Sequence, residues 1–319
     1  MIIKATRDSI AQAALHLKQG RLVAFPTETV YGLGANALDS KAVASIFAMK
    51  QRPSFDPLIV HISSLSQLWE LVTSRDERIR SLTQHFWPGP LTLVLPKSDI
   101  VPNIVTSGLP DVAVRMPANE TALQLIEAAG FPLAAPSANR FGRLSPTRAQ
   151  HVEKQLPDLE LIIDGGPCAI GLESSVVRLE ADGFRILRHG AITASMLSEV
   201  IPPSVLTPAH ILPDASPGLM LSHYSPETKL YIVGQHPVPR DTSNAAFIGL
   251  RPSEIKGYHS VRFLSDNGNL EEAAGNLFVF LHELEEAGLD FIVADAVPET
   301  GLGIAIMDRL RKAAFRFHQ

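Results

Sequence analysis

The stretch LVAFPTETVYGLGAN, residues 22–36, decides the fold class of this chain. Its first four residues, 22–25, form an apolar run that Pro26 ends, which predicts a short strand. Residues 27–36 then combine threonines with glycines and predict a polar turn where a ligand can approach the backbone. One helical pattern ends just before this stretch and another begins just after it. Such alternation of helix and strand predicts an α/β fold.

The alternation continues on both sides of this stretch. Apolar residues recur at helical spacing over 6–20, 41–50, 67–72, 79–86 and 122–129. Short apolar runs predict strands over 58–62, 91–95, 112–114, 133–135, 161–163, 175–179 and 184–187. Several of these strands follow one another without a helix between them. We therefore expect a mixed sheet rather than a purely parallel one.

The chain is long enough for more than one domain. Its 319 residues and 45% hydrophobic content are typical of about two folded domains. After a predicted helix near 192–200, six prolines lie between residues 201 and 226 and favour extended backbone. We interpret this stretch as an interdomain linker, and the plainer alternative is a passive tether. A second α/β unit follows, with strands over 230–233, 246–250, 261–264 and 291–294 and helices over 270–284 and 304–312. The predicted division is a first domain over 1–203, a linker over 204–228 and a second domain over 229–319.

Charge and cysteine content exclude several classes of protein. Lys and Arg total 28 against 33 Asp and Glu, a net charge of −5, which disfavours a broad nucleic-acid-binding surface. The single cysteine, Cys168, excludes an internal disulfide or a multi-cysteine zinc site, and we expect it to be a small apolar residue. The sequence has neither the apolar start of a signal peptide nor a run of about 20 apolar residues. We therefore expect a soluble, cytoplasmic protein without a membrane partner.

Polar segments directly follow several predicted element ends, over residues 26–34, 50–61, 113–117 and 133–139. Open α/β sheets bind ligands in crevices at strand ends. Lys50 and Arg52 can converge on one polyanion, although cations at a helix end also complement the helix dipole. Arg115 follows an apolar strand and needs an anionic partner from a ligand or from a protein carboxylate. The hydroxyl groups have a plainer interpretation as helix-capping turns.

Together these segments imply an anionic ligand with a small polar partner, such as a nucleotide with a carboxylate-bearing metabolite. The segments contain no obvious pair of nucleophile and base. Catalysis would then depend on positioning and on neutralising phosphate charge, as in nucleotidyl transfer.

The order of these motifs resembles the Sua5/YciO/YrdC family. The resemblance rests on residues 26–33 (PTETVYGL), 50–53 (KQRP), 57–61 (PLIVH), 113–117 (AVRMP), 136–139 (PSAN), 173–177 (ESSVV) and 187–190 (LRHG). Residues 216–218 with 223–226 are similar to the linker signature of the longer, two-domain Sua5 type, and residues 301–310 to its C-terminal signature. The resemblance implies a YrdC-like twisted mixed sheet with helices and a smaller, Rossmann-like C-terminal α/β domain.

The resemblance also implies an activity, that of a nucleotidyltransferase. Such an enzyme converts L-threonine, bicarbonate and ATP into L-threonylcarbamoyladenylate and pyrophosphate, with Mg²⁺ accompanying ATP and no metal caged by the protein. The product feeds the threonylcarbamoyl-transfer machinery that modifies adenosine 37 of ANN-decoding tRNAs. Direct RNA contact would at most be weak.

Site residues follow from the resemblance, motif by motif. The catalytic set it implies is Lys50, Arg52, Ser137 and Asn139. The ATP contacts it implies are Arg52, Asp56, Asp111, Ser137, Ser145, Arg188 and Tyr224, where Tyr224 would belong to a linker that folds over the cavity as a lid. The threonine contacts it implies are Thr29, His61, Arg115, Ser175 and the backbone at Ala135.

The sequence departs from the family pattern at three places, and two other functions remain open. Asp56 stands where Asn is frequent, Asp111 where Thr is frequent, and residues 219–222 replace a more polar linker stretch. One alternative is an enzyme that moves a carbamoyl group through a carbamoyl-adenylate. The other is a non-catalytic RNA-binding module, which the net charge does not support.

Overall fold

The larger of two sheets contains the polar segments described above. The computed structural model describes residues 1–204 and 223–318. Within that part of the chain, ten strands form one sheet. They are β1 (Ile2–Lys4), β2 (Val23–Phe25), β3 (Gly32–Asn36), β4 (Ile59–His61), β5 (Leu91–Pro96), β6 (Asp111–Arg115), β7 (Leu133–Ala134), β8 (Ile162–Asp164), β9 (Ser175–Glu180) and β10 (Gly183–Arg188).

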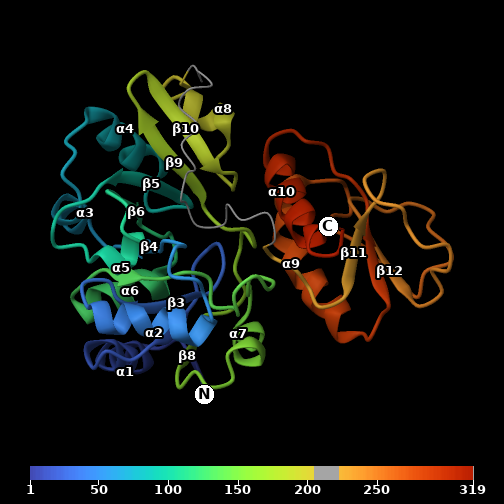
Figure 1. Cartoon of the computed structure of the whole chain (residues 1–319), viewed down its shortest axis with the longest axis horizontal. Helices are drawn as coiled ribbons and strands as arrows, with labels where there is room; N and C mark the ends of the chain where they lie inside the picture. The colour runs from blue at the N-terminus through green and yellow to red at the C-terminus, as the bar shows by residue number, and fades with distance from the viewer. Residues whose placement is uncertain (205–222, 319) are drawn as a thin grey trace.

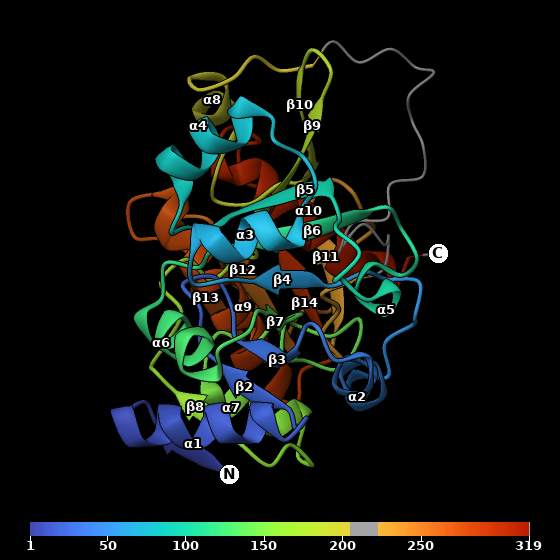
Figure 2. The ribbon, with the colours of Figure 1, turned by 90° about the vertical axis from the view of Figure 1, so that its left-hand side faces the viewer.

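The strand order is β1-β8-β2-β3-β7-β4-β6-β5-β9-β10. The pairs β1–β8, β2–β8, β4–β6 and β5–β9 are parallel, whereas β2–β3, β3–β7, β4–β7, β5–β6 and β9–β10 are antiparallel. The prediction of a mixed sheet is therefore confirmed. Figure 2 shows the hairpin of β9 and β10 at the opposite end of this unit from β8.

Helices cover this sheet and bury its apolar side chains. They are α1 (Arg7–Lys18), α2 (Ser40–Lys50), α3 (Leu65–Leu71), α4 (Glu77–Phe86), α5 (Asn103–Thr106), α6 (Glu120–Ala129), α7 (Ala149–Gln155) and α8 (Ala194–Ser198). One buried cluster includes Val43 and Ile46 of α2, and another includes Leu17 of α1 and Leu125 of α6. The apolar residues at helical spacing in the sequence thus form the buried faces of these helices.

A second, smaller unit forms the C-terminal part of the chain. Its four strands are β11 (Lys229–Ile232), β12 (Ala245–Gly249), β13 (Ser260–Phe263) and β14 (Phe291–Ala294), and its helices are α9 (Leu270–Glu286) and α10 (Leu302–Phe315). The strands are all parallel, in the order β11-β14-β12-β13. Figure 1 shows α9 and α10 between this sheet and the larger unit. The predicted smaller α/β unit is confirmed.

The prediction of a turn over residues 27–36 is wrong at its C-terminal end. Residues 32–36 form β3, which pairs antiparallel with β2 and opposes Gly34 to Val23. A Cβ atom at Gly34 would lie 2.7 Å from the ring of Phe25, so the glycine is needed for close packing of the two strands. Glycine ordinarily weakens a strand, which explains why the sequence pattern favoured a turn.

The two units share a packed boundary. The core of the C-terminal unit includes Leu144, Leu172 and Tyr224, which precede β11 in the chain. Residues 223–228 are the described part of the predicted linker's C-terminal end, whereas its signature at 216–218 and the departure at 219–222 lie outside the described residues.

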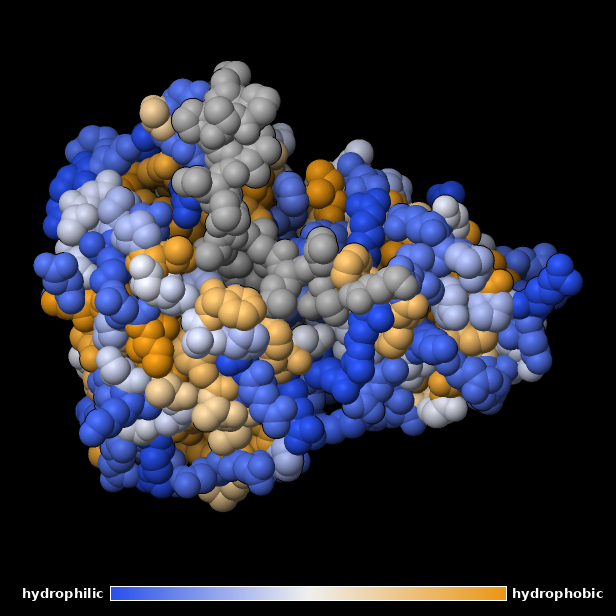
Figure 3. Space-filling view, viewed as in Figure 1, coloured by the Kyte–Doolittle hydropathy of each residue, from blue (hydrophilic) through white to orange (hydrophobic). Residues whose placement is uncertain are grey.

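Two further sequence features are visible in the structure. Cys168 is a buried free thiol, and burial raises its pKa to about 12. None of the described helices combines the length and the apolarity needed to cross a bilayer. On the face drawn in Figure 3, hydrophilic residues cover most of the C-terminal unit, and hydrophobic ones are interspersed over the larger unit.

Candidate functional site

One cavity gathers residues from most of the polar segments. It is lined by Thr27, Thr29, Val30, Gly32, Arg52, Pro57, Ile59, His61, Arg115, Ala135, Pro136, Ser137, Glu173, Ser174, Arg188, His223 and Tyr224. Strand pairing explains the convergence, because β4 and β6 are parallel neighbours whose last residues, His61 and Arg115, are register partners. The structure thus brings together eight of the predicted site residues: Thr29, Arg52, His61, Arg115, Ala135, Ser137, Arg188 and Tyr224.

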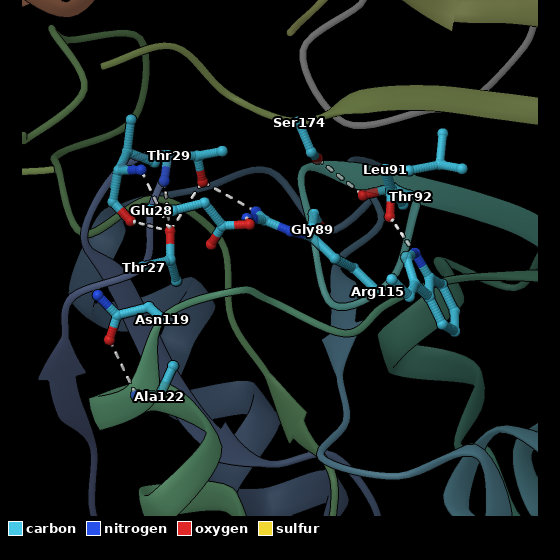
Figure 4. A network of polar contacts seen from close by, with 12 residues as sticks. Thr27, Glu28, Thr29, Gly89, Leu91, Thr92, Arg115, Asn119, Ala122 and Ser174 are labelled. Carbon is cyan, nitrogen blue, oxygen red and sulfur yellow. Dashed lines mark hydrogen bonds and ion pairs between the residues drawn. The ribbon is translucent and has the colours of Figure 1, made fainter. Parts of the chain in front are cut away.

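Arg115 is the centre of a group of polar contacts in the cavity lining. Its Nη1 donates to Thr29 Oγ1 at 2.8 Å, its Nε donates to the carbonyl oxygen of Gly89 at 3.2 Å, and its Nη2 lies 2.6 Å from Glu28 Oε1. Thr27 and Thr29 share a hydrogen bond between their hydroxyls at 2.7 Å. Figure 4 shows the guanidinium of Arg115 pointing at Glu28 and Thr29. The sequence left open whether Arg115 would meet a ligand or a protein carboxylate, and here it meets Glu28 while still facing the cavity.

His61 lies beside Arg115 as a neutral imidazole. Burial and the nearby Arg115 lower the pKa of His61 to about 3. Its Nδ1 atom is buried and has no hydrogen-bond partner among the described residues. A neutral ring with an unused nitrogen is suited to accept or donate a hydrogen bond at a polar ligand.

Arg52 is held at another part of the cavity wall by the end of α2. Gln51 adopts a left-handed backbone conformation with φ of 53°, which ends the helix just before Arg52. The Nη2 atom of Arg52 lies 2.9 Å from Asp56 Oδ1 and donates to the carbonyl oxygen of Pro57 at 2.9 Å. Burial raises the pKa of Asp56, against the opposing effect of Arg52. Asp56 and the carbonyl oxygen of Pro57 together hold the guanidinium of Arg52 in place.

Lys50 turns away from the cavity, into the loop that follows β7. Its Nζ donates to the carbonyl oxygen of Ser137 at 2.6 Å and also to that of Asn139. Asn139 in turn donates through Nδ2 to the carbonyl oxygens of Arg140 at 2.8 Å and Arg143 at 3.0 Å. Burial holds the pKa of Lys50 well below its usual range. Lys50 and Asn139 thus fix the loop that presents Ser137 to the cavity.

The remaining wall combines β9, β10 and the end of the predicted linker. Arg188 makes two hydrogen bonds to Ser174. Its Nε donates to the carbonyl oxygen at 3.1 Å, and its Nη2 donates to the hydroxyl oxygen Oγ at 3.1 Å. Tyr224 has a φ of 58°, is 1% exposed and has no hydrogen-bond partner for its hydroxyl among the described residues. Burial raises the pKa of Tyr224 to about 12, so its phenol stays protonated.

Other predicted site residues lie outside the cavity lining: Lys50, Asp56, Asp111, Asn139, Ser145 and Ser175. Asp111 begins β6, four residues and about 13 Å along the strand from Arg115, and its Oδ2 lies 3.3 Å from Nη2 of Arg178. Ser145 donates to the carboxylate of Glu173, and Ser175 donates to the carbonyl oxygen of Ile192 at 2.6 Å. Both serines therefore stabilise the cavity wall without belonging to its lining.

The site residues predicted from the sequence do not include several side chains of the cavity lining. Glu173 and His223 are the most polar of these. Both belong to motifs quoted for the family resemblance, at the first position of residues 173–177 and of 223–226. Membership in these motifs is the feature of the sequence that could have identified both residues as site residues.

Comparisons with known proteins identify the family of the chain. The Sua5/YciO/YrdC family model, described as "Telomere recombination", matches residues 16–190, and the model of the "Threonylcarbamoyl-AMP synthase, C-terminal domain" matches residues 192–315. The threonylcarbamoyl-AMP synthase of Pyrococcus abyssi is 44% identical, with 95% of this chain and 93% of that protein aligned. The synthase of Bacillus subtilis is 43% identical, with 97% and 94% aligned.

A solved structure supports the same relationship. The crystal structure of P. abyssi Sua5 complexed with L-threonine has a TM-score of 0.88 and 42% sequence identity, and covers 98% of this chain and 97% of its own. The chain therefore belongs to the Sua5/YciO/YrdC family, in its two-domain Sua5 form.

Proposed function

We propose that this chain is a threonylcarbamoyl-AMP synthase, which converts L-threonine, bicarbonate and ATP into L-threonylcarbamoyladenylate, pyrophosphate and water. The observation that carries the proposal is one cavity whose lining combines cationic, hydroxyl and aromatic side chains. The lining contains Arg115, Thr29 and His61 as one group, and Arg52, Arg188 and Tyr224 as another. Relatives that align over nearly the whole chain carry this name.

We assign L-threonine to the part of the cavity around Arg115. The guanidinium is a planar fork matched to a carboxylate, and the neutral His61 ring can bond the amine or hydroxyl of the substrate. The amide of Ala135 already donates to the carbonyl oxygen of Ile59 at 2.9 Å, so its carbonyl oxygen is the atom left for a ligand. Ser175 acts indirectly here, because its hydroxyl and its amide both bond within the protein.

We assign ATP to the wall that contains Arg52, Ser137, Arg188 and Tyr224. Two buried guanidinium groups can balance phosphate charge in a site where water is largely excluded. Four residues outside the cavity lining support this wall: Lys50, Asp56, Asn139 and Ser145. The position of Asp111 offers no support for direct ATP contact, which stays a prediction.

Two bond-forming steps account for the reaction. The threonine amine attacks the carbon supplied by bicarbonate, and a carbamate forms with loss of water. A carbamate oxygen then attacks the α-phosphorus of ATP, the new O–P bond forms, and the bond from phosphorus to the pyrophosphate oxygen breaks. Neither step needs a protein nucleophile, so positioning of the substrates and neutralisation of phosphate charge are the main tasks of the side chains.

We expect Mg²⁺ to enter with the triphosphate of ATP, which it commonly accompanies through phosphate oxygens and water. Glu173 is a carboxylate in the cavity lining, and its oxygens already bond Ser145 and Arg309. Glu173 is therefore poorly suited to hold the ion itself.

Several wider statements belong to the same proposal. The product would feed the machinery that transfers threonylcarbamoyl groups to adenosine 37 of tRNA, and the protein would act in the cytoplasm. We keep the division at 1–203, 204–228 and 229–319 as the proposed domain boundaries.

The test is pyrophosphate release from ATP, measured with each substrate omitted in turn, together with mass spectrometry of the adenylate. Release that requires both threonine and bicarbonate is expected. Release that needs carbamoyl phosphate instead would identify the carbamoyl-adenylate alternative. Salt-sensitive RNA binding without any ATP turnover would identify the RNA-binding alternative.

A further inference from the structure

Arg309 connects the C-terminal unit to the wall of the cavity. It lies on α10, 136 positions along the chain from Glu173, yet its Nε donates to Glu173 Oε2 at 2.9 Å. Its side chain is 0% exposed, compared with 6% for Glu173. A guanidinium at this depth is costly unless it is paired, so the contact defines how α10 docks against the larger unit.

The same guanidinium also supports Tyr224. The Cζ atom of Arg309 lies 5.1 Å from the centroid of the Tyr224 ring, a distance typical of a cation–π contact. Its Nη1 lies 2.7 Å from Asp308 Oδ2, and its Nη2 has no hydrogen-bond partner among the described residues. Arg309 thus contacts two residues of the cavity lining, Glu173 and Tyr224, without lining the cavity itself.

Glu173 and its neighbour Ser174 contact further residues of the cavity wall. Its second oxygen accepts from Ser145, and the next residue, Ser174, accepts both hydrogen bonds described for Arg188. Burial opposes the charge of Glu173, but Arg309 and Arg188 outweigh that effect and lower its pKa. The carboxylate is therefore held in place as an anion by groups from both units.

Backbone contacts from α10 hold the neighbouring chain. Ser225 donates through Oγ to the carbonyl oxygen of Ala313 at 3.1 Å, and its amide donates to the carbonyl oxygen of Gly142 at 2.8 Å. The amide of His223 donates to the carbonyl oxygen of Lys312 at 3.4 Å. Residues 223–225 are thereby held between α10 and the larger unit.

We propose that Arg309 is a positioning residue for the nucleotide part of the cavity, where it holds Glu173 and Tyr224 so that Arg188 and the tyrosine ring face the ATP site. The proposal rests on the proposed function, and it gives the C-terminal unit a task beyond anchoring a linker. It assigns no contact with substrate to Arg309.

The test uses the full chain and the variants Arg309→Met and Arg309→Lys. Pyrophosphate release is measured with ATP varied at saturating threonine and then with threonine varied at saturating ATP. In Arg309→Met we expect the KM for ATP to rise about tenfold or more and the KM for threonine to stay within about twofold. Arg309→Lys keeps the charge and should recover part of the ATP affinity.

A matched control lies on the same helix. Arg311 is 43% exposed and pairs with Glu299, also in the C-terminal unit, so Arg311→Met removes an arginine of α10 without touching the cavity wall. Its kinetic constants should match those of the unchanged protein. Loss of activity in the unchanged protein and in this control would refute the proposed function rather than the role of Arg309.

Other outcomes would overturn the role of Arg309. An unchanged KM for ATP in Arg309→Met, or equal rises in both KM values, would indicate a purely structural ion pair. If Arg309→Met does not fold, Arg309→Lys decides the matter through binding of a fluorescent ATP analogue by the folded variant. Weaker binding than in Arg311→Met supports positioning, and equal binding refutes it.

Discussion

The Nζ atom of Lys50 lies 2.6 Å from the carbonyl oxygen of Ser137, in the loop that contributes Ser137 to the cavity lining. The side chain is 1% exposed and also donates to the carbonyl oxygen of Asn139. A lysine of a nucleotide-binding motif is usually expected to meet phosphate directly. In this fold Lys50 instead sets the position of the backbone that carries Ser137.

Lys50→Met should therefore impair folding stability and activity together. The substitution keeps much of the length of the side chain but leaves two carbonyl oxygens without their donor. We expect the free energy of unfolding to fall by about 1–3 kcal/mol, and turnover to fall because Ser137 shifts. Urea unfolding and pyrophosphate release measure the two effects. Lys41→Met, at an exposed position of the same helix, is the control, and unchanged stability in Lys50→Met would contradict this role.

Variants of Arg52 and Asp56 should separate stability from turnover. Arg52→Ala leaves the Asp56 carboxylate buried and unpaired, which costs about 3–5 kcal/mol, and it removes a cation from the cavity. The double variant Arg52→Ala, Asp56→Asn should regain most of that stability but no turnover. Thermal unfolding and pyrophosphate release follow the two properties. Recovery of turnover in the double variant would show that Arg52 acts only by compensating Asp56.

Arg115→Lys should weaken threonine binding selectively. A lysine keeps the positive charge but cannot contact Thr29, Glu28 and Gly89 in the directions that the guanidinium uses. We expect the KM for threonine to rise about tenfold or more, while the KM for ATP changes little. Steady-state kinetics with each substrate varied are the measurement. A rise confined to the KM for ATP would contradict the assignment of threonine to Arg115.

Tyr224→Phe should change ATP affinity without changing stability. The hydroxyl has no partner among the described residues, whereas the ring packs on Arg309 and lies with its centroid 5.7 Å from that of Phe278. Removing only the hydroxyl breaks no hydrogen bond among the described residues, so the free energy of unfolding should not fall, while the KM for ATP should rise. Tyr224→Leu, which also removes the ring, is the comparison and should lower stability as well. An unchanged KM for ATP in Tyr224→Phe would mean that the ring alone contributes.

Much of the site was predictable because it lies at strand ends. The short apolar runs at 58–62 and 112–114 located β4 and β6, and polar residues after such strands converge in an α/β sheet. Side-chain direction was not predictable. Lys50 and Arg52 stand two positions apart, and only the left-handed residue Gln51 between them explains why one faces the loop and the other the cavity.

Contacts between distant segments were the other feature that could not be predicted from the sequence. Periodicity placed Arg309 on a helix but gave no sign that it pairs with Glu173, because a pattern of local spacing contains no information about docking between units. The same holds for β3, whose two glycines look like a turn until Phe25 is known to pack against Gly34.

His282 should make stability depend on pH through the boundary between the two units. Its Nε2 lies 3.1 Å from the carbonyl oxygen of Ser145, and its ring stacks on that of His151 at 3.9 Å between centroids. Burial lowers the pKa of His282 to about 4, below the usual value of 6.5, so the unfolded chain binds the extra proton more readily. Stability is therefore complete above about pH 6.5 and is lost as the pH falls towards 4, by up to about 1.4 kcal/mol per pH unit for one such group.

The variant His282→Gln removes this proton uptake but keeps an amide donor near Ser145. The measurement is the free energy of unfolding in urea between pH 7 and 4.5, for the unchanged protein, His282→Gln and the exposed control His85→Gln. The slope against pH should be shallower in His282→Gln than in the other two proteins. His151 also has a pKa lowered to about 3 by burial and by the neighbouring His282, so some pH dependence should persist. Equal slopes in all three proteins would show that the boundary between the units tolerates a charged His282.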